Sequence, residues 1–252
     1  MIGLTGPRGV GKTTLVLQHI KEELDRNKAL YVTAEDFYFA SHKLVDLADS
    51  FAKLGGKYLF IDEIHKYKDW SKELKLIYDY HPELNVIFTG SSVLDINKGA
   101  SDLSRRAVMY QMQGLSFREY LQLFHHISIN TYSLSDILQH KIELPKDFRP
   151  LVYFTNYLKS GYYPFALEGD FDVRLQQIIN HTLESEIAAI LSASRNNIED
   201  YSLYIEEAGF IAQLRDATGG VRGLGKVDKI YLDNTNLIYS CLLYTSPSPR
   251  DS

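Results

Sequence analysis

A glycine-rich segment near the amino terminus constrains this chain more than any other feature. It reads Gly6-Pro7-Arg8-Gly9-Val10-Gly11-Lys12-Thr13-Thr14 and fits the pattern G-x-x-x-x-G-K-S/T. Glycines in such a loop allow successive backbone N–H groups to close around phosphate oxygens. We expect the ammonium of Lys12 to reach the outer phosphates of a nucleotide, and the hydroxyl of Thr13 to ligate Mg²⁺. The apolar residues after Thr13 predict a helix, whose N-terminus also favours an anion. The segment therefore predicts a phosphate site between a first strand and a helix.

The second informative segment is an apolar run, residues 58–63, that ends in two acids. Buried parallel strands have this pattern, with polar groups at the carboxyl edge where α/β proteins bind their ligands. We expect Asp62 to hold Mg²⁺, directly or through water. Glu63 is placed to orient or deprotonate an attacking water. The alternative is an ordinary strand end with two solvated acids.

The order of elements between these two segments narrows the fold. Residues 29–33 predict another strand, and residues 42–51 have the apolar spacing of a helix. A further strand and helix thus separate the phosphate loop from the strand that ends in Asp62 and Glu63. This order resembles the additional-strand, catalytic-glutamate class of P-loop NTPases, which includes the AAA+ proteins. The expected fold class is therefore α/β, a parallel sheet flanked by helices.

Two further polar positions are candidates for this site. A fourth predicted strand, residues 86–89, is followed closely by Ser91 and Ser92. In AAA+ proteins a polar residue at this place contacts the γ-phosphate and the attacking water, and the resemblance assigns this role to Ser91, with Ser92 in reserve. A plain polar turn is the alternative. Arg106 is a candidate for stabilising charge on the transferred phosphate, within the chain or across a subunit contact. The equally open alternative is that Arg105 and Arg106 pair with nearby surface acids.

Four short segments together resemble a bacterial and archaeal group of AAA-type ATPases. They are Gly-Pro-Arg-Gly-Val-Gly-Lys-Thr-Thr, Phe-Ile-Asp-Glu-Ile-His-Lys, Phe-Thr-Gly-Ser-Ser and Leu-Ser-Phe-Arg-Glu-Tyr. The resemblance covers residues 1–165 well and residues 166–240 loosely. It implies a P-loop ATPase domain, a helical lid, a winged-helix region and a further C-terminal domain. It also implies ATP and Mg²⁺ as ligands, but no defined cellular task. We expect Mg²⁺-dependent ATP hydrolysis coupled to a conformational or assembly change, in a homo-oligomer or with a protein partner. The alternative function is a nucleotide-gated switch or a DNA-associated regulator, in which binding matters more than turnover.

The predicted elements divide the chain into four parts. Residues 1–126 form the expected ATPase core, and residues 127–170 a helical lid or linker. Residues 171–240 are expected to form a winged-helix-like region. Residues 241–252 resemble a translated sequencing adapter, so we leave this tail out of fold reasoning and expect the natural chain to continue beyond Ser240. The shortness of the first predicted strand indicates that Met1 is an internal methionine or a truncated start.

The winged-helix-like region raises the question of DNA binding. Residues 194–198 are expected to open a recognition helix, and strands near residues 210–214 and 229–232 to flank a hairpin wing. Residues 194–232 carry five basic and six acidic side chains, so the basic footprint of a DNA-binding unit is absent. A structural or protein-contacting role is therefore favoured, and DNA stays the less favoured partner. Its candidate phosphate contacts are Arg195, Arg222 and Lys226.

Composition limits the remaining classes. The formal net charge of −5 gives no general attraction to nucleic acid. The only cysteine is Cys241, inside the suspect tail, which excludes a disulfide framework and a cysteine-ligated metal elsewhere. No apolar run approaches the roughly 18 residues of a membrane span, and no signal peptide is visible. We therefore expect a cytoplasmic protein without a membrane partner.

Overall fold

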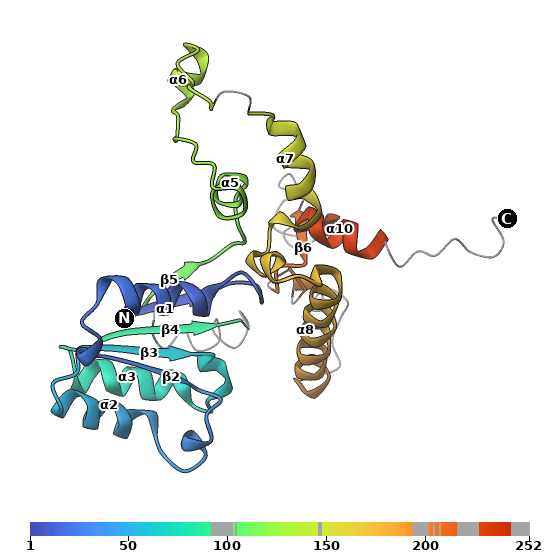
Figure 1. Ribbon diagram of the computed structural model, residues 1–252. Helices are drawn as coiled ribbons and strands as arrows, with labels where there is room; N and C mark the ends of the chain where they lie inside the picture. Colours follow the sequence, from blue (N-terminus) through green and yellow to red (C-terminus); the bar gives the residue numbers. More distant parts are fainter. Residues whose placement is uncertain are drawn as a thin grey trace.

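The computed structural model describes residues 1–91, 103, 105–145, 148–193, 202–203, 205–206, 208–215 and 227–242. Its first part is a five-stranded parallel sheet with the strand order β2-β3-β4-β1-β5 (Figure 1). The strands are β1 Ile2–Thr5, β2 Ala29–Thr33, β3 Tyr58–Asp62, β4 Asn85–Gly90 and β5 Val108–Gln111. Because the strands are parallel, the carboxyl ends of β1, β3 and β4 lie together at one edge of the sheet.

Helices cover both faces of this sheet (Figure 1). Alternate residues of a strand point to opposite faces. Leu59 and Ile61 of β3 are buried in a core shared with α2 and α3, whereas Phe60 between them meets the ring of His19 in α1, edge-on at 6.4 Å. The helices are α1 Lys12–Glu23, α2 Leu44–Lys53 and α3 Trp70–Tyr80, with the 3₁₀ turns η1 Arg26–Lys28, η2 Phe37–Ala40 and η3 Ile64–Lys66. The predicted fold class, a parallel sheet flanked by helices, is confirmed.

The middle of the chain is helical and aromatic. Its elements are α5 Phe117–His125, α6 Leu134–Leu138, α7 Pro150–Asn156, the π-helical turn η4 Tyr157–Gly161 and the 3₁₀ turn η5 Pro164–Glu168. The ring of Phe117 in α5 lies 5.2 Å from that of Phe154 and 5.5 Å from that of Tyr157. These contacts fix α5 against α7 and η4, while α6 stands apart at the end of an extended segment (Figure 1).

The last part of the chain forms a second core. It contains α8 Phe171–Ala193, the antiparallel pair β6 Ile211–Arg215 and β7 Val227–Leu232, and α10 Thr235–Leu242. The buried residues of this core are Val10, Tyr163, Leu175, Phe210 and Leu237. The two strands expected near residues 210–214 and 229–232 do pair.

Other expectations for this part lie outside the described residues. They are the start of the recognition helix at residues 194–198, the candidate DNA contacts Arg195, Arg222 and Lys226, Ser92, and residues 243–252 of the suspect tail. Within the described ranges, no helix has the length and apolarity needed to cross a bilayer.

Candidate nucleotide site

The glycine-rich segment forms a loop between the end of β1 and the start of α1. Its glycines have positive φ angles of 145° at Gly6, 82° at Gly9 and 100° at Gly11. Residues with a Cβ rarely adopt such angles, and at Gly6 a Cβ would also collide with the backbone oxygen of Met112. The carbonyl of Gly11 accepts the N–H of Leu15 at 2.9 Å, so α1 begins directly after the loop. The loop therefore has the strand–loop–helix arrangement that an anion site requires.

Lys12 is folded into this loop. Its Nζ donates to the carbonyl oxygens of Gly6 at 2.8 Å and Pro7 at 2.9 Å, and the residue is only 6% exposed. Burial lowers the pKa of Lys12 to about 8, although the carboxylates of Glu63 and Asp62 act in the opposite direction. The ammonium thus stands among backbone dipoles at the place where phosphate oxygens are expected.

The Asp62 carboxylate lies at the end of β3 and accepts hydrogen bonds from three hydroxyl groups. Thr13 and Tyr31 each donate to Oδ2 at 2.7 Å, and Thr89 donates to Oδ1. Burial alone would raise the pKa of Asp62, but the bonds from Thr89, Tyr31 and Thr13 lower it below its ordinary value. Thr13 and Asp62, the two residues expected to hold Mg²⁺, are therefore in contact. A carboxylate and a hydroxyl are the hard oxygen ligands that suit this ion.

Tyr31 and Thr89 were not among the expected site residues. Thr89 is one residue before the end of β4, and the adjacency of parallel strand ends is a signal that points to it. Tyr31 sits in the middle of β2, and its hydroxyl reaches Asp62 along the sheet. No sequence pattern predicts that reach, because it depends on how β2 and β3 are paired.

Glu63 and Ser91 are brought together beside this carboxylate. Ser91 Oγ donates to Glu63 Oε2 at 3.1 Å, and the backbone N–H of Glu63 donates to Thr89 Oγ1 at 3.2 Å. Glu63 has a φ of 51°, a left-handed conformation that is uncommon outside glycine. The end of β4 therefore fixes both the backbone and the side chain of Glu63.

A cavity of about 470 Å³ opens over the phosphate loop. Its polar wall includes Lys12, Thr13 and Glu63, and its apolar wall includes Leu123 of α5 and Phe165 of η5. The full lining is Arg8, Gly9, Gly11, Lys12, Thr13, Thr14, Glu63, Leu123, Pro164, Phe165, Leu167 and Glu168. Segments well beyond the sheet therefore contribute to the lining of the site.

Arg106 does not line this cavity. Its guanidinium makes a two-point ion pair with Asp79 of α3, with Nε 2.9 Å from Oδ1 and Nη2 3.1 Å from Oδ2. It also lies over the ring of Tyr78, 5.9 Å from the centroid. Within one chain the structure thus has the surface pairing that was the alternative interpretation. A role for Arg106 across a subunit contact stays a prediction.

The sheet order identifies the fold of this site. β4 lies between β1, which leads into the phosphate loop, and β3, which carries Asp62. Along the chain, β2 and α2 stand between the loop and β3, which is the order expected of the additional-strand class. The chain has a P-loop NTPase fold.

Comparisons with known proteins agree with this assignment. A family profile described as "AAA domain" matches residues 1–121. An uncharacterized protein of Methanocaldococcus jannaschii is 32% identical over an alignment of 187 residues that covers 68% of this chain. The chain spans 39% of the length of that relative. Together these similarities support an AAA-type ATPase family.

Similarity to solved structures is weaker. C. elegans PCH-2 matches 57% of this chain over 48% of its own, with 18% identity and a TM-score of 0.36. A katanin structure matches 64% of this chain over 57% of its own length, with 16% identity and a TM-score of 0.37. An Hsp104 complex matches 51% of this chain over 28% of its own chain, with 19% identity and a TM-score of 0.36. Likeness at this level does not bear on function.

Proposed function

We propose that this protein binds ATP together with Mg²⁺ and hydrolyses the terminal phosphoanhydride bond. The observation that best supports this is the contact between Thr13 and Asp62, with Glu63 beside it and Lys12 in the loop below. Hydrolysis needs a phosphate cradle, a metal-binding pair and a separate carboxylate for the water. Each of these requirements has a candidate residue at this one edge of the sheet.

The proposed roles follow from the chemistry of each group. The loop from Gly6 to Thr14 encloses the phosphates with its N–H groups, and Lys12 leaves its backbone partners to contact the outer phosphates. Asp62 and Thr13 hold Mg²⁺, which when bound supplies positive charge to the phosphate oxygens. Glu63 orients or deprotonates the attacking water. Ser91 contacts the γ-phosphate and links it to the Glu63 carboxylate.

A second candidate function is a nucleotide-gated switch, in which binding matters more than turnover. The observation that favours it is the burial of Val10, a residue of the phosphate loop, in the second core. Either function would be coupled to a conformational change or to assembly with another copy or a protein partner. In an assembly, Arg106 of a neighbouring subunit would stabilise charge on the transferred phosphate. The C-terminal part would contact a partner, of which DNA is the less favoured.

The test compares ATP turnover in the wild-type protein, Lys12→Ala and Glu63→Gln. Glu22→Gln, the same chemical change on the exposed side of α1, is the matched control. We expect Lys12→Ala to lose nucleotide binding. Glu63→Gln should bind MgATP normally but turn it over roughly 100-fold or more slowly, because a general base contributes about this much.

Two results would contradict the proposal in different ways. Wild-type turnover in Glu63→Gln would remove Glu63 from the mechanism. Tight MgATP binding without turnover in the wild-type protein would favour the switch, and oligomeric state with and without ATP would then be the measurement that follows.

A further inference from the structure

The carboxylate of Glu63 has a second neighbour, the imidazole of His65. Nε2 of His65 lies 3.4 Å from Oε2 of Glu63, and the His65 side chain is only 6% exposed. Ser91 donates to the same oxygen at 3.1 Å. Both contacts fall on Oε2, so within the described part of the chain Oε1 is the oxygen left to receive a proton from water.

The chemistry of the pair fixes the direction of this contact. An ionised carboxylate can only accept hydrogen bonds, so a favourable contact requires a hydrogen on Nε2 of His65. Contacts that involve an ionised group are stronger than neutral ones, and more so where water is excluded. We propose that His65 is a positioning residue, which holds Oε2 of Glu63 so that Oε1 is presented to the attacking water. This inference rests on the proposed ATPase function.

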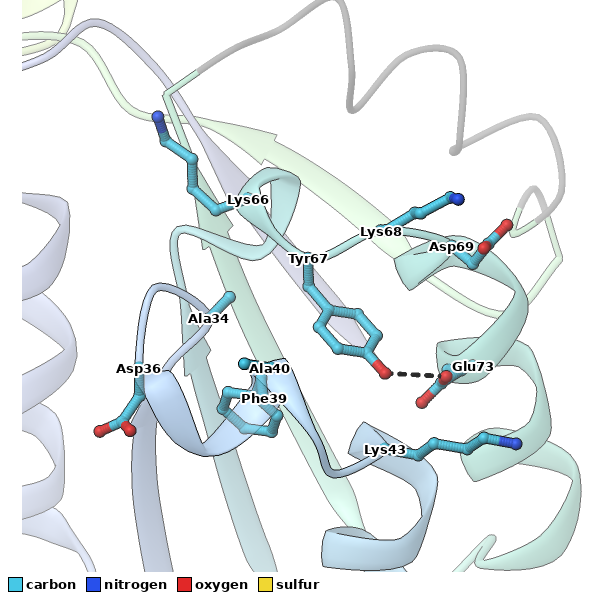
Figure 2. A pocket seen from close by; sticks show the side chains of 10 residues that line it. All are labelled: Ala34, Asp36, Phe39, Ala40, Lys43, Lys66, Tyr67, Lys68, Asp69 and Glu73. Carbon is cyan, nitrogen blue, oxygen red and sulfur yellow. Dashed lines mark hydrogen bonds between the residues drawn. The ribbon is translucent and has the colours of Figure 1, made fainter.

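The segment that carries His65 is well anchored. His65 belongs to η3, and Tyr67 directly after η3 donates its hydroxyl to Glu73 Oε1 of α3 at 2.9 Å (Figure 2). The other oxygen of Glu73 accepts the N–H of Val45 in α2 at 3.1 Å. The turn is therefore tied to two helices, and His65 approaches Glu63 from a fixed support.

A fixed support matters because the side chain of Glu63 is flexible and its backbone is strained. Its side chain has three rotatable bonds, and ordering such a side chain at each turnover would cost conformational entropy. Its backbone already occupies a sparsely populated conformation, which the surrounding structure must maintain. Contacts from Ser91 and His65 to the same oxygen, Oε2, order the carboxylate before the nucleotide binds.

The competing explanation is that His65 only fills space beneath η3. The two explanations differ in what a substitute must provide. Filling space requires volume, whereas positioning requires an N–H at the place of Nε2. Glutamine places its amide near that position, leucine offers volume without a donor, and asparagine is too short to reach it.

The experiment measures kcat, KM and the Kd for MgATP in His65→Gln, His65→Leu and His65→Asn. We expect His65→Leu to lower kcat on the order of 10- to 100-fold, the loss that follows from misplacing a reacting group by about 1 Å. KM and Kd should stay at the wild-type values, because the histidine does not line the nucleotide cavity. His65→Gln should retain most of the wild-type kcat. In a Glu63→Gln background, His65→Leu should cause no further loss, because the two residues act as a unit.

Each outcome decides the inference. If wild type and His65→Leu have equal kcat, the positioning role of His65 is overturned while the ATPase proposal stands. The same holds if His65→Leu and His65→Gln both lose MgATP affinity and thermal stability together. If His65→Leu does not fold, an active His65→Gln beside a deficient His65→Asn supports positioning, and equal activities overturn it. Absence of turnover in the wild-type protein, or wild-type turnover in Glu63→Gln, overturns the proposed function and this inference with it.

Discussion

The buried ammonium of Lys12 sets a pH dependence for nucleotide binding. Its pKa is lowered to about 8, chiefly by burial, so the free protein loses this charge at moderately alkaline pH. Binding of anionic phosphates requires the charged form. We therefore expect the Kd for MgATP to be constant below about pH 8 and to rise above it, by up to about tenfold per pH unit. Calorimetric titration between pH 7 and pH 10 measures this profile.

Two variants serve as controls for the Lys12 profile. Lys12→Gln should bind weakly with no break near pH 8, and Lys21→Gln, on the exposed side of α1, should keep the wild-type profile. A flat wild-type profile would contradict the prediction.

The stability of the free protein should increase over the pH range in which nucleotide binding weakens. The unfolded chain, with a lysine pKa of 10.5, binds more protons than the folded chain between pH 8 and that value, so unfolding free energy rises with pH in this window.

At the level of residues, the sequence named several side chains that the structure brings together. Thr13 with Asp62, and Glu63 with Ser91, were expected on separate grounds, and each pair is in hydrogen-bond contact. Loop glycines and strand-end acids leave a strong local pattern, because backbone geometry and burial dictate them. The ion pair of Arg106 with Asp79 depends on a helix 27 residues away, and no local pattern encodes it.

At the level of elements, α5 shows how a short helix is held in place beside the nucleotide site. Ser116 accepts the N–H of Glu119, and Glu119 in turn accepts the N–H of Ser116 at 2.7 Å, forming a capping box. The helix buries Tyr120 and Leu121 and presents Leu123 to the cavity. We expect Ser116→Ala to lower the free energy of unfolding by about 1 kcal/mol, measured by denaturant titration.

The chain contains a matched control for this prediction. Ser133 forms the same capping box with Asp136 at the start of α6. That helix has five residues and buries none of them. Ser133→Ala should therefore fray α6 locally and change the global unfolding midpoint less than Ser116→Ala does. Equal shifts for the two variants would show that the packing of α5 contributes nothing to its stability.

The elements themselves were more predictable than their arrangement. The strands β2, β3 and β4, the helix α2 and the β6–β7 pair were expected from apolar spacing and turn signals. Which elements contact the phosphate loop could not be predicted, since that depends on packing between segments more than 100 residues apart.

At the scale of the whole molecule, the phosphate loop connects β1 of the sheet to the second core. Val10 is 1% exposed and packs with Tyr163, Leu175, Phe210 and Leu237. Gly9 lies so close to the Phe165 ring that an added Cβ would approach it to 2.8 Å. The loop that is expected to change shape around phosphate is thus part of the packing of α8 and α10. Nucleotide binding should therefore change the packing and stability of the C-terminal part of the chain.

Val10→Ala tests this connection. The variant removes two buried methyl groups from the second core, which should cost about 2 kcal/mol in that core. Amide hydrogen exchange in α8 and α10 should then be faster by roughly 30-fold where opening of this core limits exchange. Val16→Ala, an equal change at a residue of α1 that is 5% exposed and outside the second core, should leave exchange in α8 and α10 unchanged. MgATP should slow exchange in α8 and α10 of the wild-type protein, and less so in Val10→Ala. If Val10→Ala and Val16→Ala affect α8 equally, the loop does not transmit its state through Val10.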